Sequence, residues 1–463
     1  MNFLIKFPTR SRPEAFTKSF ETWYRKLSGK HEVLFLITVE EDDTTVPELV
    51  KLIQPILKTP KPGATVEFDY GQSKGKHHAI NRGLEGRRFD VLITGADDLF
   101  VEAQNYDDIV AKDFEKYYPA LDGALNYWDG FRQDLQCTMT IMGYNLYRRF
   151  GYIYQPAYKS LFGDTEFSPV VEQMHKIIHV PEWKANTKNC LIKHCHPVFT
   201  GGPRDALLIK NDSFYNSDEV LFEKRKAKNF DLKRPKLSIL ICTVLQRRDT
   251  FKALVDSLHA QIFNLPNPWD VEVLYISDNG EMSVGAKRNQ LLDWARGEYI
   301  CYVDDDDRIW GDYIAKILKA LETKPECVGI NTITTFDGVG PQMREYYPEH
   351  LSIGNVIQDG IVKSPPYHLN PIRADIAKSA RFPNKNLQED CAYAEQVRSK
   401  IKSGITIKDP IYHYDFSTTG TLTQGNNIPT GAPATARPVV VRPRRRRVWD
   451  AAGNLIPHPD EKR

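Results

Sequence analysis

The feature that most restricts the fold is a long internal repeat, in which two halves of the chain carry the same order of apolar runs, helical stretches and acidic turns. Each half opens with an apolar strand, 3–7 in one and 237–244 in the other, followed by arginines and a helix-like segment. A repeat of about 200 residues is far longer than the roughly 20–50 residues of a solenoid unit, so it indicates a duplicated domain. Strands alternating with helices predict an α/β fold with a mainly parallel sheet in each half.

The repeat extends to the polar turns that follow the strands. In open α/β sheets ligands bind outside the carboxyl ends of the strands, so acids directly after an apolar strand point to a ligand site. The matching segments are 40–43 and 278–280, 71–84 and 285–295, 97–98 and 304–307, 162–166 and 387–390, and 191–196 and 411–415.

At 463 residues the chain is too long for one ordinary domain. We predict a first domain at 1–225, a second at 235–418 and a flexible tail at 419–463, with the lysine-rich stretch 222–236 as linker. The tail is rich in Gly, Pro and Thr and carries the arginine run 444–447, a composition typical of disorder.

The overall composition, 41% hydrophobic and 26% charged, is that of a soluble globular protein. No apolar stretch approaches the ~20 residues that cross a bilayer, and the first residues predict a core strand rather than a signal peptide. The seven cysteines are odd in number and form no Cys-x-x-Cys pair, which predicts free thiols in a reducing compartment. We therefore expect a cytoplasmic protein without a transmembrane segment; its oligomeric state is not indicated.

The four aspartates 304–307 directly follow the apolar strand 299–303. Four adjacent carboxylates repel one another, and a divalent cation removes that repulsion. Oxygen ligands suit Mg²⁺ or Mn²⁺, which share their coordination with phosphate oxygens. The alternative is a solvated acidic turn, but the burial expected for the preceding strand favours a metal site.

The neighbouring motifs add a nucleotide-sugar signature. They are the strand 237–243, which ends in Thr243 and is followed by Arg247, then Asp278, Gly285-Ala-Lys-Arg288-Asn289, Arg296-Gly-Glu-Tyr-Ile300, Asp304-x-Asp306, Glu389-Asp390 and His413. In this order and spacing, about 237–417 resembles family-2-type glycosyltransferases of the GT-A fold. The resemblance implies two tandem GT-A domains with a disordered C-terminal tail, and a hexosyl- or pentosyltransferase activity dependent on Mn²⁺ or Mg²⁺.

The resemblance also assigns roles. Asp304 and Asp306 match the metal motif, Asp390 the catalytic base, and His413 a late metal or diphosphate ligand. Asp305 and Asp307 are then expected to support the backbone.

Other matches contact the nucleotide-sugar donor: Thr243, Arg247, Asp278, Arg288 and Asn289. Each residue also has a structural interpretation. Asp390 can be a helix-start carboxylate, Asp278 part of an Asp-Asn-Gly turn, His413 a hydrogen-bonded strand histidine, and Arg288 and Asn289 helix-solvating groups.

The first half departs from the pattern. Gly95 stands where the metal motif is expected to start, leaving Asp97 as the surviving ligand. Asp164 matches the base, and His194 or His196 the late ligand. A zinc site at 194–196 lacks a second ligand pair at zinc spacing.

In the first half, Lys76, His77 and His78 replace the Lys-Arg of the second half, which can compensate for weaker metal charge. The first half is thus either a second transferase or a degenerate domain retained for binding or packing.

The acceptor is left open by the sequence. Tandem transferases of this appearance resemble phage-encoded enzymes that modify hydroxymethylated pyrimidines in DNA, and the arginine-rich tail fits a DNA partner in a host cytoplasm. A cell-surface or lipid-linked glycan is the alternative acceptor. A non-catalytic module that binds nucleotide-sugars or glycans is the alternative from another class. The segment 332–366 shows no recognisable pattern.

Overall fold

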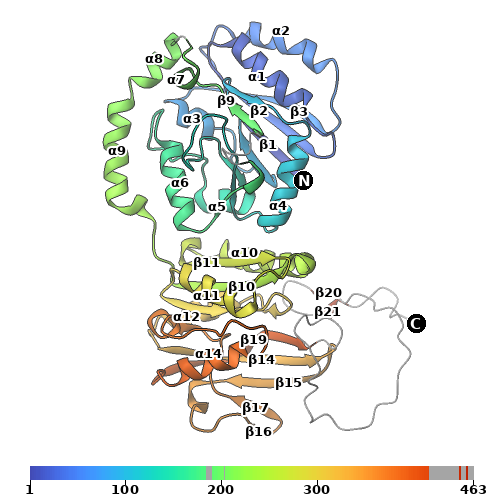
Figure 1. Ribbon diagram of the computed structural model, residues 1–463, viewed down its shortest axis with the longest axis vertical. Helices are drawn as coiled ribbons and strands as arrows, with labels where there is room; N and C mark the ends of the chain where they lie inside the picture. The colour runs from blue at the N-terminus through green and yellow to red at the C-terminus, as the bar shows by residue number, and fades with distance from the viewer. Residues whose placement is uncertain (184–189, 203, 417–447, 450–454, 457–463) are drawn as a thin grey trace, which may run out of the picture. The chain divides into compact units, whose positions relative to one another are not determined.

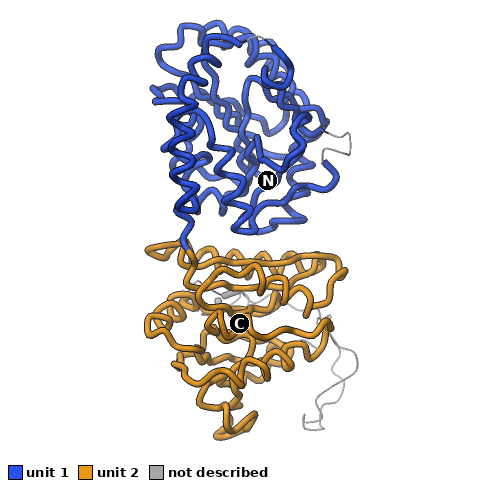
Figure 2. Tube along the Cα trace, turned by 60° about the vertical axis from the view of Figure 1, so that its left-hand side comes forward, with its two compact units in different colours: residues 1–233 blue, residues 234–463 orange. Residues whose placement is uncertain are grey.

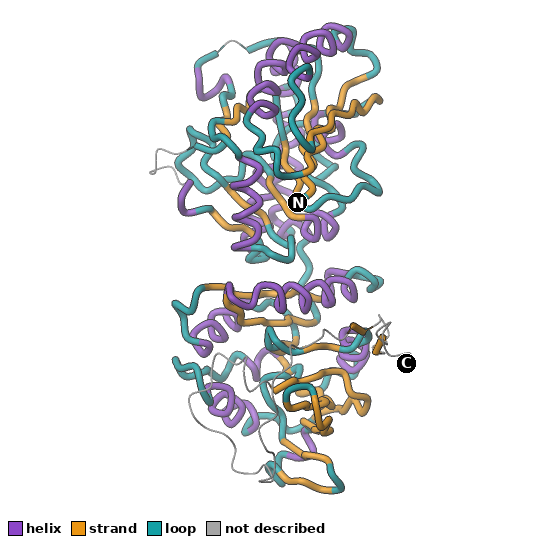
Figure 3. Tube along the Cα trace, turned by 90° about the vertical axis from the view of Figure 1, so that its right-hand side faces the viewer, coloured by secondary structure: helices purple, strands orange, loops and turns teal. Residues whose placement is uncertain are grey.

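The computed structural model describes residues 1–183, 190–202, 204–416, 448–449 and 455–456. The chain divides into two compact units, Met1–Lys233 and Arg234–Arg463, which are coloured separately in Figure 2. In each unit helices lie beside the strands, as Figures 1 and 3 show. The predicted linker, 222–236, begins inside the helix α9 (Tyr215–Ala227) of unit 1. Most of the predicted tail, 419–463, lies outside the described residues, as does its arginine run.

Unit 1 is built on a seven-stranded sheet within the described residues. Strands β3, β2, β1 and β4 are parallel, and β7 is the first antiparallel neighbour. In sheet order the strands are β3 (Ala64–Gly71), β2 (Glu32–Glu40), β1 (Asn2–Pro8), β4 (Val91–Thr94), β7 (Ile141–Gly143), β6 (Ala124–Asn126) and β8 (Ile177–His179). A separate ribbon pairs β5 (Leu99–Val101) with β9 (Ile192–His194).

The helices of unit 1 follow from their apolar spacing. In α1 (Pro13–Arg25) the aromatic residues Phe16, Phe20 and Trp23 recur on one helical face, and all three are fully buried. They pack against Phe7 of β1, whose ring centroid lies 4.8 Å from that of Phe16. The other helices are α2 (Val46–Leu57), α3 (Lys76–Asn81), α4 (Tyr106–Tyr117), α5 (Tyr144–Phe150), α6 (Gly163–Gln173), α7 (Pro197–Thr200), α8 (Ala206–Asp212) and α9.

Unit 2 repeats the start of this plan and then diverges. Strands β11, β10 and β12 are parallel, and the sheet continues through antiparallel neighbours. The sheet order is β11 (Val271–Asp278), β10 (Leu237–Val244), β12 (Tyr299–Tyr302), β18 (Ile372–Arg373), β14 (Cys327–Phe336), β15 (Val339–Tyr346), β17 (Ile361–Ser364) and β16 (Val356–Gln358). The long strand β19 (Gly404–Phe416) pairs with both β14 and the short β13 (Arg308–Ile309). The segment 332–366, in which no pattern was recognised, thus supplies the end of β14 and the strands β15–β17, where β17 pairs parallel to β15 and antiparallel to β16.

Helix α10 (Arg248–Ile262) buries an apolar stripe that includes Phe251, Val255 and Leu258. Helices α11 (Val284–Trp294) and α14 (Glu389–Arg398) contribute Leu291 and Tyr393 to a core cluster with the strands. The remaining helices are α12 (Tyr313–Leu321) and α13 (Ala374–Ala377). Strands β20 (Val448–Trp449) and β21 (Leu455–Ile456) pair with each other.

Among the helices that the structure describes, none combines the length and apolar character needed to cross a membrane. The seven cysteines are free: Cys137, Cys301 and Cys327 are buried and Cys391 is exposed.

Candidate active site

The acidic run of unit 2 lies where the parallel sheet reverses its winding direction. Strand β10 lies between β11 and β12, so the chain leaves its carboxyl end toward one side and later returns on the other. Such a switch point is where open α/β sheets bind ligands. The ends of β10, β11 and β12 carry Val244, Asp278 and, just beyond Tyr302, the aspartates.

Burial alternates along the four aspartates. Asp305 and Asp307 are 4% and 3% exposed. The side chains of Asp304 and Asp306 are 31% and 33% exposed. Two carboxylates therefore face inward and two remain accessible to a ligand, and the metal role of Asp304 and Asp306 stays a prediction.

The inward pair is anchored by neighbouring strands. Asp305 accepts a hydrogen bond of 2.7 Å from the hydroxyl of Thr243, and its other oxygen lies 2.7 Å from Arg247 Nη1. Asp307 accepts a 2.6 Å hydrogen bond from the hydroxyl of Tyr412. Thr243 and Arg247 were predicted to contact the donor, and here they position the acidic turn.

The first accessible acid is held by two buried basic groups. Arg288 Nη2 lies 2.9 Å from Asp304, and Arg288 Nη1 lies 3.7 Å from Glu389, so one guanidinium links the acidic turn to the start of α14. His368 Nε2 lies 3.5 Å from the other oxygen of Asp304. Burial opposes ionisation of Asp304, but Arg288, then His368 and Arg247, hold its pKa below the ordinary value.

The second accessible acid is less well compensated. Burial raises the pKa of Asp306 to about 6, and the attraction of Arg247 at 3.1 Å is opposed by the neighbouring carboxylates of Asp305 and Asp304. A bound cation would relieve this repulsion.

The carboxylate oxygens of Asp304 and Asp306 are suitable ligands for Mn²⁺ or Mg²⁺ that is also bound by a phosphate-bearing ligand. Within the described residues no three His, Cys, Asp or Glu groups converge closely enough to form a complete metal cage. Mg²⁺ is commonly held by one or two carboxylates together with substrate phosphates, and Asp304 and Asp306 supply such a pair. Both ring nitrogens of His368 and Nη1 of Arg288 are buried beside this pair and have no hydrogen-bond partner among the residues that the structure describes.

Asp278 forms the turn considered for it, and its contact with the donor nucleotide stays a prediction. Its carboxylate accepts backbone N–H bonds from Gly280 at 3.0 Å and Met282 at 2.9 Å, which make the predicted turn. It is also ion-paired with the buried Lys287, which donates a 2.8 Å hydrogen bond to the carbonyl of Thr243. Burial opposes ionisation, but the hydrogen bond from Lys287 lowers the pKa of Asp278.

The two acids at the start of α14 differ in access. Glu389 is 4% exposed and faces Arg288, whereas Asp390 is partly exposed. Burial raises the pKa of Asp390, but the charge of His368 and a hydrogen bond from Tyr367 outweigh it and lower the pKa overall. An ionised, accessible carboxylate can accept a proton at neutral pH.

The structure shows other contacts for two further candidates. His413 Nε2 lies 2.9 Å from the hydroxyl of Thr335. The side-chain amide of Asn289 bonds the backbone of Phe382 at 2.7 and 3.0 Å, fastening α11 to the segment before α14. The ligand roles of His413 and Asn289 stay predictions.

Three residues of this site were not identified from the sequence. Lys287 lies inside the quoted Gly-x-x-Arg-Asn motif and Tyr412 directly precedes His413, so adjacent residues offered a signal for both. His368 follows the segment without a pattern and reaches Asp304 only through the fold, so no local signal identifies it.

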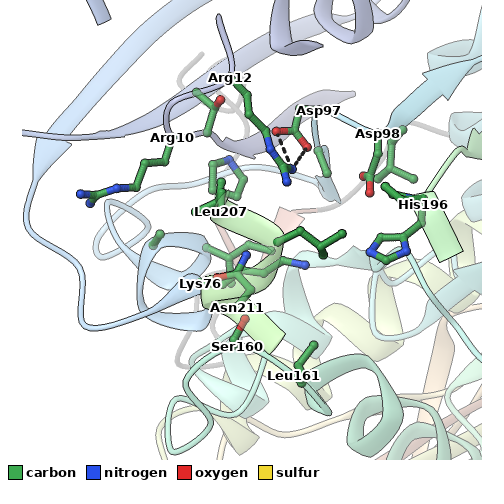
Figure 4. A pocket seen from close by; sticks show the side chains of 18 of the residues that line it. Arg10, Arg12, Lys76, Asp97, Asp98, Ser160, Leu161, His196, Leu207 and Asn211 are labelled. Carbon is green, nitrogen blue, oxygen red and sulfur yellow. Dashed lines mark hydrogen bonds and ion pairs between the residues drawn. The ribbon is translucent and has the colours of Figure 1, made fainter. Parts of the chain in front are cut away.

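In unit 1 the predicted site residues line one cavity of about 1380 Å³ (Figure 4). They include Lys76, Asp97, Asp164, His194 and His196, and His77 also lines the cavity. His78 is not among the lining residues.

The cavity residues of unit 1 have defined partners. Both oxygens of Asp97 lie 3.2 Å from Arg12 Nη1, and Asp98 lies 3.4 Å from His194 Nε2. Asp164 accepts a 2.9 Å hydrogen bond from Gln136. The metal role of Asp97 and the base role of Asp164 stay predictions.

The strand registers align the two units differently from the sequence comparison. Lys6 of β1 pairs with Thr94, as Leu240 of β10 pairs with Tyr302. The next residue donates the same type of backbone bond in both units, Gly95 N to Lys6 O and Val303 N to Leu240 O.

Counted forward from this strand register, Gly95 corresponds to Val303 and Ala96 stands where unit 2 has Asp304. Counted back from the ribbon pairs Leu99–His194 and Arg308–His413, Gly95 corresponds to Asp304, as expected from the sequence. By the strand register, Asp97 and Asp98 correspond to Asp305 and Asp306.

Comparison with known proteins supports the interpretation of unit 2 as a glycosyltransferase domain. The family model described as Glycosyl transferase family 2 matches residues 247–375. EpsH of Bacillus subtilis (strain 168), a protein named as a glycosyltransferase, is 27% identical over a region covering 28% of this chain. The chain spans 41% of the length of that relative.

Two solved structures share part of this chain. TarS 1–349 of S. aureus in complex with UDP-GlcNAc is 16% identical, with 39% of this chain and 58% of that chain covered and a TM-score of 0.29. The mannosyltransferase PcManGT from Pyrobaculum calidifontis, in complex with GDP-Man and Mn²⁺, is 14% identical, with 40% and 55% covered and a TM-score of 0.32. Both TM-scores are too low to support a conclusion about this chain. The match over residues 247–375 identifies a glycosyltransferase domain of family 2, with the GT-A fold, in unit 2.

Proposed function

We propose that unit 2 transfers a sugar from a nucleotide-sugar donor to an acceptor hydroxyl with inversion at the anomeric carbon, in a reaction dependent on Mn²⁺ or Mg²⁺. The observation that carries this proposal is the link through Arg288. Its guanidinium lies 2.9 Å from the accessible Asp304 and 3.7 Å from Glu389, next to Asp390. Arg288 thereby holds Asp304, the acid proposed to face the diphosphate, close to the helix start that carries the candidate base Asp390.

The leaving group of the reaction is a nucleoside diphosphate, whose negative charge grows as the sugar departs. Asp304 and Asp306 would hold the metal ion, which when bound neutralises part of that charge. Arg247 and Arg288 add fixed positive charge at the same place, where they need little reorganisation during the reaction. Asp278 with Lys287 is placed at the end of β11 to orient the nucleoside.

Asp390 is the proposed base. The acceptor oxygen attacks the anomeric carbon, its proton passes to the Asp390 carboxylate, and the bond from the anomeric carbon to the diphosphate oxygen breaks with its electron pair staying on the nucleotide. Glu389 is buried against Arg288, so Asp390 is the accessible acid of the pair. One base and one displacement produce inversion.

The principal test compares Asp306→Asn with Asp249→Asn, a matched change at a side chain that is 93% exposed on α10. We expect release of nucleoside diphosphate from a panel of nucleotide-sugars with Mn²⁺ to fall at least 100-fold in Asp306→Asn and to stay unchanged in Asp249→Asn. Asp390→Asn is expected to lose turnover while donor binding remains. Equal, negligible turnover in wild type and variants would identify a non-catalytic binding module.

For the acceptor we propose hydroxymethylated pyrimidine in DNA, as in phage-encoded enzymes, supported by the arginine run 444–447. Sugar transfer is to be measured on hydroxymethylated DNA, unmodified DNA and a lipid-linked glycan. Transfer to the modified DNA that weakens steeply with salt supports this acceptor. Transfer to the glycan alone rejects it.

A further inference from the structure

The cavity of unit 1 occupies the same topological position as the site of unit 2. Strand β1 lies between β2 and β4, and the chain leaves the carboxyl end of β1 toward one side and returns to β4 on the other. The cavity is lined by the segments that follow these strands, by α3 and by the start of α6. Ligands of open α/β sheets bind at such switch points.

An ion pair at this position is repeated in both units. Arg12 directly precedes α1 and lies 3.2 Å from Asp97. Arg247 directly precedes α10 and lies 2.7 Å from Asp305, the residue that corresponds to Asp97 by strand register. Figure 4 shows the Arg12–Asp97 contact at the cavity wall. Unit 1 thus has the same arginine–aspartate ion pair that supports the acidic turn in unit 2.

The start of α6 repeats the start of α14. Both helices begin after a residue with left-handed backbone, Phe162 at φ 66° and Gln388 at φ 57°. The second helical residue is Asp164 in one and Asp390 in the other, and each carboxylate accepts a bond from the next backbone N–H, at 2.9 and 2.7 Å. A non-glycine residue in this conformation is costly, so its presence at both helix starts marks a shared local design.

The cavity wall contains buried polar groups that have no partner in the described part of the chain. They are Thr9 Oγ1, His77 Nδ1 and Ser160 Oγ, on side chains 8%, 3% and 2% exposed. A buried polar atom without a hydrogen bond costs about 1–3 kcal/mol, and these three atoms lie within the cavity wall with almost no accessible surface of their own.

The charge of the cavity differs from that of unit 2 at one decisive place. Ala96 replaces the accessible acid Asp304, and the exposed Lys76 has no ion-pair partner among the described residues. Lys76 lies near Asp97 and Asp98. Burial raises the pKa of Asp97, and the charge of Lys76 opposes that rise. One acid fewer and an unpaired lysine leave this cavity better suited than unit 2 to bind an anionic group through protein charges.

The cavity volume of about 1380 Å³ exceeds the roughly 300–1,000 Å³ of typical small-molecule sites. A ligand as long as a nucleoside diphosphate with its sugar therefore fits.

We propose that unit 1 contains a second nucleotide-sugar site, in which Lys76 contacts the diphosphate. The chain then binds two nucleotides, one in each unit. The unit 1 site stands on its own contacts, so it does not depend on catalysis in unit 2.

The experiment uses the full chain and isothermal titration with UDP, GDP, ADP, CDP and dTDP in the presence of Mn²⁺. Wild type is expected to bind two equivalents in total. Asp304→Asn with Asp306→Asn removes one equivalent. Adding Lys76→Glu weakens the remaining one at least tenfold, whereas adding Lys51→Glu, at an exposed lysine of α2 outside the cavity, leaves it unchanged.

Loss of all binding in the Asp304→Asn, Asp306→Asn chain overturns the proposal, and so does equal binding by the Lys76→Glu and Lys51→Glu chains. Displacement of the remaining nucleotide by pyrophosphate at the same concentration as by the nucleotide itself also overturns it, because the site then recognises phosphate groups without a nucleoside. Failure of the unit 2 proposal looks different: turnover is absent while the Lys76-dependent equivalent persists.

Discussion

At the scale of single residues, Phe7 and Gly95 form a complementary pair in the core of unit 1. A Cβ on Gly95 would lie 2.5 Å from the ring of Phe7, which is fully buried against α1. Unit 2 has Ile241 and Val303 at the corresponding positions, both buried. One large and one absent side chain thus replace two of medium size. Gly95 is explained by packing, so an acid placed there would enter the core rather than the site.

We predict that Gly95→Val destabilises unit 1 by about 1–3 kcal/mol, because the added side chain overpacks against Phe7. Combining it with Phe7→Ile recreates the pair of unit 2 and should cost less than the sum of the single changes by at least about 1 kcal/mol. Urea unfolding of the two single variants and the double variant measures this coupling. Strict additivity would falsify the proposed exchange of volumes.

His368 is a second residue whose importance comes only from the fold. It is 3% exposed, lies 3.5 Å from Asp304 and has no hydrogen-bond partner for either ring nitrogen among the described residues. Groups behind a metal ligand orient it and commonly change metal affinity by 10–100-fold. We therefore treat His368 as a positioning residue for Asp304.

His368→Asn is expected to raise the Mn²⁺ concentration that gives half-maximal activity by about tenfold, with kcat at saturating Mn²⁺ changed much less. His350→Asn is the control, because His350 is a buried histidine of unit 2 that faces Glu345 rather than the aspartates. A drop in kcat with an unchanged Mn²⁺ midpoint contradicts the positioning role.

At the scale of elements, one side chain joins three parts of unit 2. Arg288 leaves α11, reaches Asp304 beyond β12 and Glu389 at the start of α14, and stacks 5.5 and 5.4 Å from the rings of Tyr302 and Phe382. Burial opposes its charge, but Asp304 and the other nearby acids raise the pKa of Arg288 further. The helices and the strand end are therefore locked by a buried charge network.

Removing one partner of a buried ion pair leaves an uncompensated charge and typically costs about 3–5 kcal/mol. We predict that Arg288→Met destabilises unit 2 by about 3 kcal/mol. Arg381→Met, in an ion pair with Asp293 whose partners are 53% and 59% exposed, should cost less than about 1 kcal/mol. Chemical denaturation of both variants distinguishes these values, and similar losses in the two contradict the network.

The elements that carry regular patterns could be predicted from the sequence, and those held by long-range contacts could not. The predicted strand 3–7 is β1 (Asn2–Pro8), and the helix-like segment expected after the strand 237–244 is α10 (Arg248–Ile262), because apolar periodicity follows burial directly. Strands β15–β17 had no such signal, since the edge strand β16 is exposed throughout and β15 has no fully buried residue.

At the scale of the whole molecule, the repeat in the sequence predicted the position of both candidate sites but not their chemistry. The same order of apolar strands and polar turns around two switch points led to the prediction of a second site, and most of the residues expected there line the cavity of unit 1. The strand register and the ribbon register align Gly95 one residue apart, because the loop between the strand end and the following ribbon is one residue shorter in unit 1, which only the backbone registers reveal. The contacts of Arg288 and His368 likewise require three dimensions.

At the scale of a compact unit, the buried His77 makes the stability of unit 1 depend on pH. Its ring is 3% exposed and packs 5.5 Å from that of Tyr154. Burial, and then the charge of Lys76, lower the pKa of His77 from 6.5 to about 3. Between these values the unfolded chain binds the proton and the folded chain does not, so stability falls as the pH drops below about 6.5.

At pH 5 the protonation of the unfolded form favours unfolding of unit 1 by about 2 kcal/mol through this group alone, since each pKa unit is worth about 1.4 kcal/mol. Denaturation at pH 7 and pH 5 should show this loss in wild type and in His78→Leu, whose histidine is exposed. His77→Leu removes the titrating group and should remove about 2 kcal/mol of the acid sensitivity, whatever its effect at pH 7. An unchanged difference between the two pH values in His77→Leu assigns the acid response to the carboxylates of the cavity instead.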